Sequence, residues 1–119
     1  MTVEEIEKIK NYIDEHIDNM RIASDLPQKF YYSYTALAEN FKEMTGENIK
    51  SYVLRKRIET VRKHIESGKM INESFVLAGY SPSGARTWGK QRYIEIYGER
   101  PSETKRRVQN DNLSNSKNQ

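Results

Sequence analysis

The segment from Ile71 to Pro101, INESFVLAGYSPSGARTWGKQRYIEIYGERP, constrains the fold of this chain more than any other stretch. Its apolar residues predict a short helix from Ile71 to Ala78, and Gly79 is the residue type that commonly follows a helix end. Ser81-Pro82 is a helix start signal, with the serine as N-cap and the proline in the first turn. Because Gly98 then provides a second stop, we expect two helices joined by a tight glycine-containing turn.

The second of these helices has two chemically different faces. Steps of three and four residues predict a buried face made of Ala85, Trp88, Gly89, Tyr93, Ile96 and Tyr97. The opposite face carries Arg86, Thr87, Lys90 and Gln91. Gly84 and Gly89 each weaken a helix by roughly 0.5 to 1 kcal/mol relative to alanine, unless Gly89 permits close approach of another helix. A helix that follows a tight turn and presents cationic and amide side chains is suited to entering the DNA major groove.

The N-terminal residues predict an amphipathic helix followed by a short one. Thr2 and Glu5 form a capping box, and apolar residues then recur in steps of three and four, so we expect a helix over residues 3 to 20. A short helix is expected over about residues 25 to 31, and its start signals are Ser24, Asp25 and Pro27.

A second helix-turn-helix arrangement is expected in this first half. Ser33 caps a helix that places Leu37 and Phe41 in the core and ends at Gly46. A single long helix is then expected from Asn48 to Ser67. The predicted fold is all-α: an N-terminal helix and first helix-turn-helix unit (1–47), a linker helix (48–68), a second unit (69–107) and a disordered tail (108–119).

Composition excludes several classes of protein. The chain has no cysteine, which removes disulfides, thiolate metal sites and thiol nucleophiles. Its two histidines lie far apart in sequence, and no nucleophile, base and acid set or phosphate-binding glycine loop is present. We therefore expect no enzyme activity, metal or cofactor. No apolar stretch is long enough to span a membrane and the N-terminus is acidic, so a cytoplasmic protein is expected.

Charge is distributed unevenly along the chain. Residues 1 to 20 carry six acids against two lysines, a net charge of −4, whereas residues 54 to 107 carry thirteen Lys or Arg against six acids, a net charge of +7. This asymmetry favours a polyanionic partner for the C-terminal half.

The order of these elements resembles the DNA-binding domain of AraC-type bacterial transcription regulators, which consists of two homeodomain-like helix-turn-helix units in tandem. The family pattern F-K-x-x-T-G resembles residues 41–46, Y-x-x-x-x-R-I resembles residues 52–58, and I-x-x-x-A-x-x-x-G-F-S resembles residues 71–81. The closing G-x-x-P-S-E is found in residues 98–103, and the resemblance covers Ile6 to Arg106. It implies sequence-specific binding of double-stranded DNA, without a sensor domain in this chain.

The resemblance also implies which residues meet DNA. Counted back from Gly98, the groove-facing positions of the second unit fall on Arg86, Thr87, Lys90 and Gln91, and the matching positions of the first unit are Tyr34, Thr35, Ala38 and Glu39. We expect side chains at helix starts, together with Lys and Arg, to hold the DNA backbone: Ser33, Lys42, Arg55, Arg57, Ser81, Ser83 and Arg92. The segment departs from the family in one respect, since Gly79 to Gly98 is about three residues longer than usual, close to one extra helical turn.

Two alternatives stay open. The stretch AGYSPSGAR also resembles the helix-turn-helix of phage small terminase subunits, which bind DNA as oligomers, whereas a monomer is expected from the main interpretation. The first unit departs from the family by lacking glycine in its turn and by placing Glu39 where a DNA-contacting arginine is common. It therefore also suits an adaptor that binds a protein such as RNA polymerase or another regulator.

Overall fold

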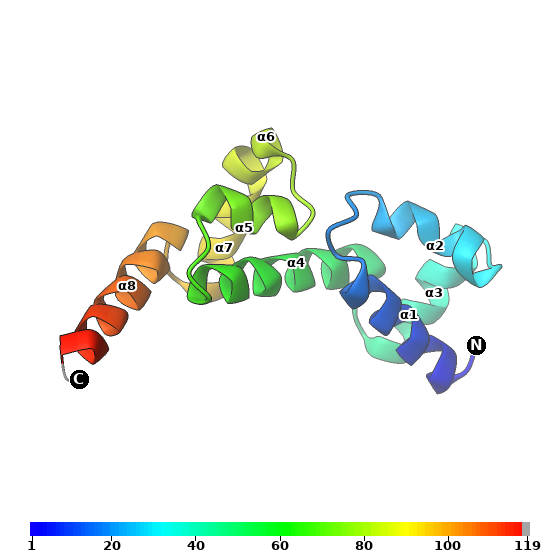
Figure 1. The fold of residues 1–119 in the computed structure, drawn as a ribbon. Helices are drawn as coiled ribbons and strands as arrows, with labels where there is room; N and C mark the ends of the chain where they lie inside the picture. Colours follow the sequence, from blue (N-terminus) through cyan, green and yellow to red (C-terminus); the bar gives the residue numbers. More distant parts are fainter. Residues whose placement is uncertain (118–119) are drawn as a thin grey trace. The chain divides into compact units, whose positions relative to one another are not determined.

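The computed structural model describes residues 1–117, and every regular element in that range is a helix, as predicted (Figure 1). In chain order these are α1 (Val3–Glu15), α2 (Ile22–Phe30), α3 (Tyr34–Thr45), α4 (Ile49–Glu66), α5 (Ile71–Leu77), α6 (Pro82–Gly84), the π-helical segment η1 (Ala85–Gly89), α7 (Lys90–Tyr97) and α8 (Pro101–Lys117). Two compact units divide the chain, residues 1–56 and the residues from 57 onward. The boundary lies within α4, so the helix predicted as a linker contributes to both units.

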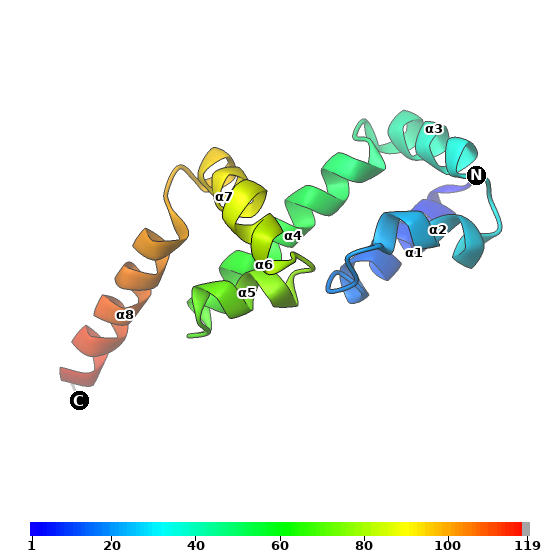
Figure 2. The same ribbon diagram turned by 90° about the horizontal axis from the view of Figure 1, so that it is seen from above.

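The first unit packs α1, α2, α3 and the start of α4 around a single core, and the three short helices lie together in both ribbon views (Figures 1 and 2). The predicted capping box of Thr2 and Glu5 is present. Tyr52 donates a hydrogen bond from its hydroxyl to Asp14 (3.0 Å), which ties α4 to α1. The buried side chains are Ile6, Ile9, Ile13, Ile17, Ile22, Leu26, Leu37, Phe41, Ile49, Tyr52 and Val53.

Two helix limits in this unit differ from the sequence prediction. The helix expected to reach residue 20 ends at Glu15, where no basic side chain is present in the last turn to offset the negative end of the helix dipole. The next helix begins at Ile22, earlier than expected, because Asn19 accepts from the Arg21 backbone N–H (2.9 Å) and thereby orders the entry. Neither predicted cap residue acts as one, since Ser24 donates to the Arg21 carbonyl (2.9 Å) and Asp25 accepts from Asn19 (2.7 Å).

The turn between α2 and α3 places Tyr31 in the left-handed backbone region, at φ 59°. A residue with a Cβ pays about 1 to 2 kcal/mol for this conformation, and the Tyr31 ring is 93% exposed, so its removal costs little packing. We expect Tyr31→Gly to raise the free energy of unfolding by about 0.5 to 1 kcal/mol, after allowing for the greater freedom of glycine in the unfolded chain. Urea unfolding followed by circular dichroism measures this change.

A matched control is Tyr34→Gly, because Tyr34 is also exposed but lies inside the first turn of α3. Glycine at a helical position lowers stability by about 1 kcal/mol, so the two substitutions should act in opposite directions. A loss of stability in Tyr31→Gly similar to that in Tyr34→Gly would show that the turn is not strained.

The second unit packs the remainder of α4 against α5, η1 and α7. Its buried side chains are Ile58, Val61, Ile65, Phe75, Ala78, Tyr80, Ala85 and Tyr93. The start signals in this unit are confirmed, because Ser81 accepts from the Gly84 backbone N–H (3.0 Å) and Pro82 occupies the first turn. Gly98 ends α7 in the left-handed region, as expected from its position.

The predicted buried face of the helix over residues 83 to 97 is wrong at two positions. Trp88 is 71% exposed and Ile96 is 40% exposed, although Ala85, Gly89 and Tyr93 are buried as expected. The reason is a change of helical period, since Ala85–Gly89 is π-helical and the Lys90 backbone N–H bonds to the Ala85 carbonyl, five residues earlier. One additional residue in this turn rotates the side chains relative to a regular α-helix.

The C-terminal residues also differ from the prediction. The tail expected to be disordered from residue 108 instead continues α8 to Lys117, while its last two residues, 118 and 119, lie outside the described residues. No glycine or proline interrupts the chain after Pro101, so no residue type in this stretch opposes a helix strongly.

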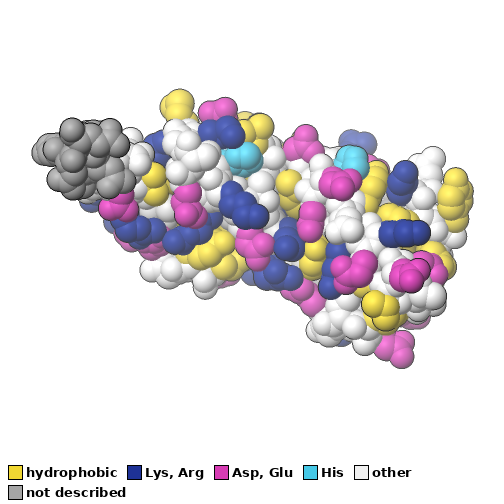
Figure 3. All heavy atoms as spheres, turned by 60° about the horizontal axis from the view of Figure 1, so that its bottom comes forward, with side chains coloured by type: hydrophobic (Ala, Val, Ile, Leu, Met, Phe, Trp, Pro, Cys, Tyr) yellow, Lys and Arg dark blue, Asp and Glu magenta, His cyan; other side chains and the backbone are white. Residues whose placement is uncertain are grey.

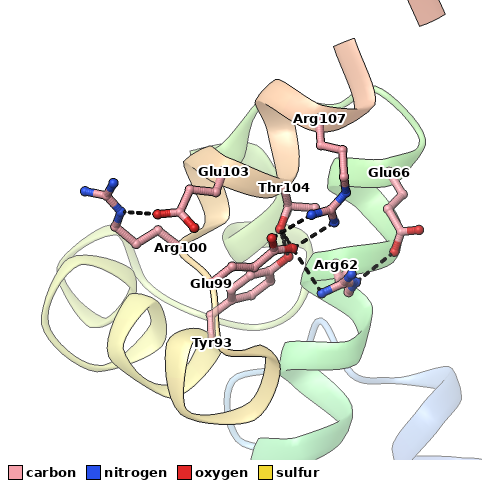
Figure 4. A network of polar contacts seen from close by, with 8 residues as sticks. All are labelled: Arg62, Glu66, Tyr93, Glu99, Arg100, Glu103, Thr104 and Arg107. Atoms are coloured by element: carbon pink, nitrogen blue, oxygen red, sulfur yellow. Dashed lines mark hydrogen bonds and ion pairs between the residues drawn. The ribbon is translucent and has the colours of Figure 1, made fainter. Parts of the chain in front are cut away.

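A polar network holds the start of α8 in the second unit (Figure 4). Arg107 donates two hydrogen bonds to the Glu99 carboxylate (2.6 and 2.8 Å), and Thr104 donates a third (2.7 Å). Tyr93 then donates from its buried hydroxyl to Thr104 (2.7 Å), and Arg62 lies 3.4 Å from Glu99. The hydrogen bonds from Arg107, followed by that from Thr104, lower the pKa of Glu99 from 4.5 to about 2.

This shift predicts a dependence of stability on pH. Because the pKa of Glu99 is lowered in the folded chain, its carboxylate stabilises the second unit above about pH 4.5, and that stabilisation disappears as the pH falls toward 2. We expect Glu99→Gln to be less stable than the unmodified chain at pH 6, and we expect this difference to be much smaller at pH 2.5. Urea unfolding at both pH values measures the difference. Glu103→Gln is the control, since Glu103 pairs with Arg100 on the surface, and a pH dependence of the same size there would contradict the assignment.

Candidate nucleic-acid interface

The helix after the Gly79 turn presents most of its predicted groove-facing residues to solvent. Arg86, Thr87 and Gln91 are exposed, and Lys90 is half-buried. The Ser81 cap fixes where the helix begins, and Ala85, Gly89 and Tyr93 anchor its other side in the core. The segment that carries these side chains is therefore held by packing and by a cap.

Trp88 lies in the same segment, but the periodicity of the sequence assigned it to the buried face. The signal that could have revealed it is the spacing from Gly79 to Gly98, which is about three residues longer than the family pattern. Three residues fall short of a full 3.6-residue turn, and a local change of period, such as the one at Ala85–Gly89, accommodates such a mismatch. The indole thus joins Arg86, Thr87 and Gln91 among the exposed side chains of this segment.

The start of each candidate reading helix is capped by a serine. Ser33 accepts from the Ala36 backbone N–H (3.1 Å), as Ser81 does from Gly84, while the exposed Ser83 hydroxyl lies 3.3 Å from that of Ser81. Backbone N–H groups at a helix start suit a phosphate oxygen because they lack partners within the helix and carry the positive end of the dipole.

The first unit presents a different surface on α3. Tyr34, Thr35 and Glu39 are exposed, Ala38 is half-buried, and none of these four side chains is cationic. Lys42, one turn further along α3, is exposed. This helix therefore offers less attraction for phosphate than the helix after Gly79.

The cations predicted to meet the DNA backbone on α4 already have partners within the protein. Arg55 donates two hydrogen bonds to Glu47 (2.9 and 3.3 Å), and its guanidinium lies over the Tyr52 ring. Arg57 is half-buried with its guanidinium 5.9 Å from the centre of the Tyr80 ring, and burial lowers its pKa. Each would have to change these contacts to reach a phosphate, so their roles stay predictions.

Charges on other parts of the surface are mixed. On the face drawn in Figure 3, Lys and Arg side chains lie among Asp and Glu side chains. Arg92, on α7, likewise pairs with Glu95 at 3.3 Å. The net positive charge of residues 54 to 107 is therefore partly compensated locally, and sequence selectivity has to come from particular side chains.

No protein-family model matches the sequence, and no curated protein matches it. The fold is similar to a solved structure, the C-terminal domain of AraT, a response regulator from Geobacillus stearothermophilus, with a TM-score of 0.75. The match covers 85% of this chain and 83% of that one at 16% sequence identity. The predicted all-α fold is confirmed, and it is the fold of that C-terminal domain.

Proposed function

We propose that this chain, which has the fold of an AraC-type DNA-binding domain, binds double-stranded DNA sequence-specifically and regulates transcription in the bacterial cytoplasm. The observation that carries the proposal is the joint exposure of Arg86, Thr87 and Gln91 on a capped helix that follows a tight turn. Within residues 1–117 no helix is long and apolar enough to cross a membrane.

The exposed side chains divide into two roles. Arg86 has the paired donors that recognise the guanine edge in the major groove, and Gln91 has the donor and acceptor that recognise the adenine edge, while Lys90 and Thr87 supplement them. The amides near Ser81 and Ser83, with Arg92, hold the adjacent phosphates. This division separates affinity from selectivity, because phosphate contacts carry no sequence information.

The first unit contributes a second and weaker set of contacts in this proposal. Thr35 and Tyr34 meet base edges, Ser33 and Lys42 meet the backbone, and Glu39 accepts from a cytosine amino group. If both units dock, the two contacted grooves lie about 34 Å apart along the duplex, and a monomer then spans a non-palindromic site.

Selection of bound duplexes from a random DNA pool, at a fixed physiological salt concentration, tests the proposal. We expect an enriched motif, and we expect Thr35→Ala to lose base preferences in one half of it while retaining the other half. The proposal is contradicted if no motif is enriched and binding disappears with modest added salt, which would leave only non-specific attraction to a polyanion.

An adaptor function is the second candidate, and the exposure of Tyr31, Tyr34 and Glu39 on the first unit favours it over a terminase-like role. Glu39→Arg distinguishes the two because it adds a cation to α3. Stronger DNA binding would support a groove-facing helix, whereas unchanged DNA affinity with loss of binding to RNA polymerase would support the adaptor. Glu7→Arg on α1, an exposed position with the same change of charge, is the control. A ring-sized mass in solution would instead favour the terminase-like role.

A further inference from the structure

Trp88 is the single tryptophan of the chain, and it is 71% exposed. An indole is the largest apolar side chain, so its exposure on a structured helix needs a physical reason. The position is well defined by its neighbours, because Ala85 and Gly89 on either side of it are buried in the core of the second unit.

The packing beneath η1 explains why the indole faces outward. A Cβ placed on Gly89 would lie 2.7 Å from Cε1 of Phe75 and 3.5 Å from Cε1 of Tyr80, so these two rings already fill the space under the helix. The Phe75 ring is fully buried and meets the Tyr80 ring edge to face, with centroids 5.6 Å apart. The core side of η1 therefore has no room for a large side chain.

Trp88 is adjacent in sequence to the candidate base-reading residues and is exposed as they are. The segment Ala85–Gly89 carries Arg86 and Thr87 directly before Trp88, and the exposed Gln91 follows in the next turn. Single π-helical turns are uncommon and frequently occur at functional sites. The exposed surface of this segment thus combines a cation, a hydroxyl, an amide and one large apolar group.

In the major groove of DNA, the apolar group that a protein can recognise is the C5-methyl group of thymine, since the other groove-edge features are hydrogen-bond donors and acceptors. We propose that Trp88 contacts this methyl group and selects thymine at one position of the bound site. This inference rests on the proposed function, and it goes beyond it by assigning a specificity-determining role to a side chain that makes no hydrogen bond to a base.

Fluorescence provides a direct test, because excitation at 295 nm reports on Trp88 alone in this chain. Binding of the selected duplex is measured independently by anisotropy of a labelled DNA end. When the duplex binds, we expect acrylamide to quench Trp88 several-fold less effectively than in the free protein. If no duplex binds, the proposed function fails. If a duplex binds and quenching by acrylamide is unchanged, the proposed function stands and the role of Trp88 is wrong.

Replacing each thymine of the selected site with deoxyuridine tests the methyl contact itself. This change removes one methyl group and no hydrogen bond, so we expect about fourfold weaker binding at a single position. Trp88→Ala should bind the thymine and uracil duplexes equally. The control is Ile96→Ala, which also truncates an exposed apolar residue of the same helical stretch. This variant should still bind the thymine duplex more tightly than the uracil duplex. The inference would be overturned if Trp88→Ala still bound the uracil duplex more weakly than the thymine duplex. It would also be overturned if the unmodified chain bound every uracil duplex as tightly as the thymine duplex.

Discussion

Replacing Gly89 with valine is expected to lower the free energy of unfolding of the second unit by about 3 kcal/mol. A Cβ at this position would lie 2.7 Å from Cε1 and 2.9 Å from Cδ1 of Phe75, closer than atoms of this kind approach. Phe75 is fully buried, so its ring can move only by displacing other core side chains. Urea unfolding measures the loss, and amide hydrogen exchange within residues 57–117 assigns it to this unit.

Thr87→Val is the matched control, because it introduces the same side chain two residues earlier, at an exposed position of the same segment. We expect it to change stability by less than about 0.5 kcal/mol. Adding Phe75→Leu to Gly89→Val should recover part of the loss, since the smaller side chain vacates the space that the valine needs. Equal losses in Gly89→Val and Thr87→Val would show that the close approach of η1 and Phe75 is unimportant.

Replacing Arg86 with alanine should weaken binding to the selected DNA site by about 1 to 3 kcal/mol, the range for a bidentate contact to guanine. This corresponds to roughly 5- to 150-fold in Kd. The preference for one base pair of the motif should be lost as well. Titration of labelled duplexes that carry each of the four base pairs at that position measures both effects.

Arg106→Ala provides the comparison, because Arg106 is an exposed arginine of the same unit on α8 and its replacement removes the same charge. We expect this variant to weaken binding to selected and random duplexes alike, and to preserve the preference for the motif. If Arg86→Ala behaved in the same way, Arg86 would act only through its charge and another residue would have to read the base.

The helix starts that have a serine cap and the helix stops that have a glycine were predictable from sequence because their causes are local. Ser33 and Ser81 cap their helices through backbone N–H groups three residues away, and Gly46 and Gly98 adopt the left-handed conformation at helix ends. Each signal involves a few consecutive residues, so neighbouring units cannot easily override it.

The position of Trp88 was not predictable in the same way. A regular 3.6-residue period assigns it to the core, whereas Ala85–Gly89 is π-helical and Gly89 packs closely against Phe75, which comes from another helix. The continuation of α8 past residue 107 was also missed, and in the structure Arg107 of this helix pairs with Glu99, which precedes the helix. Such contacts involve residues outside the helix, and the periodicity within one helix carries no information about them.

The candidate base-reading residues of the second unit were largely accessible to sequence reasoning, since Arg86, Thr87 and Gln91 are exposed as expected. The sequence could not show that the cations on α4 already have partners within the protein. The pairing of Arg55 with Glu47 and the position of Arg57 over Tyr80 depend on how the turns that carry Glu47 and Tyr80 fold back against α4. Their availability to a phosphate is therefore a property of the folded chain.

The division of α4 between two cores limits how the protein can be dissected. Ile49, Tyr52 and Val53 belong to the first core, and Ile58, Val61 and Ile65 of the same continuous helix belong to the second. A fragment cut at the boundary would leave each piece with a truncated helix and two new unsatisfied helix ends. Independent study of either unit therefore requires a fragment that retains α4 in full, with the apolar side chains of its unused half replaced by polar ones.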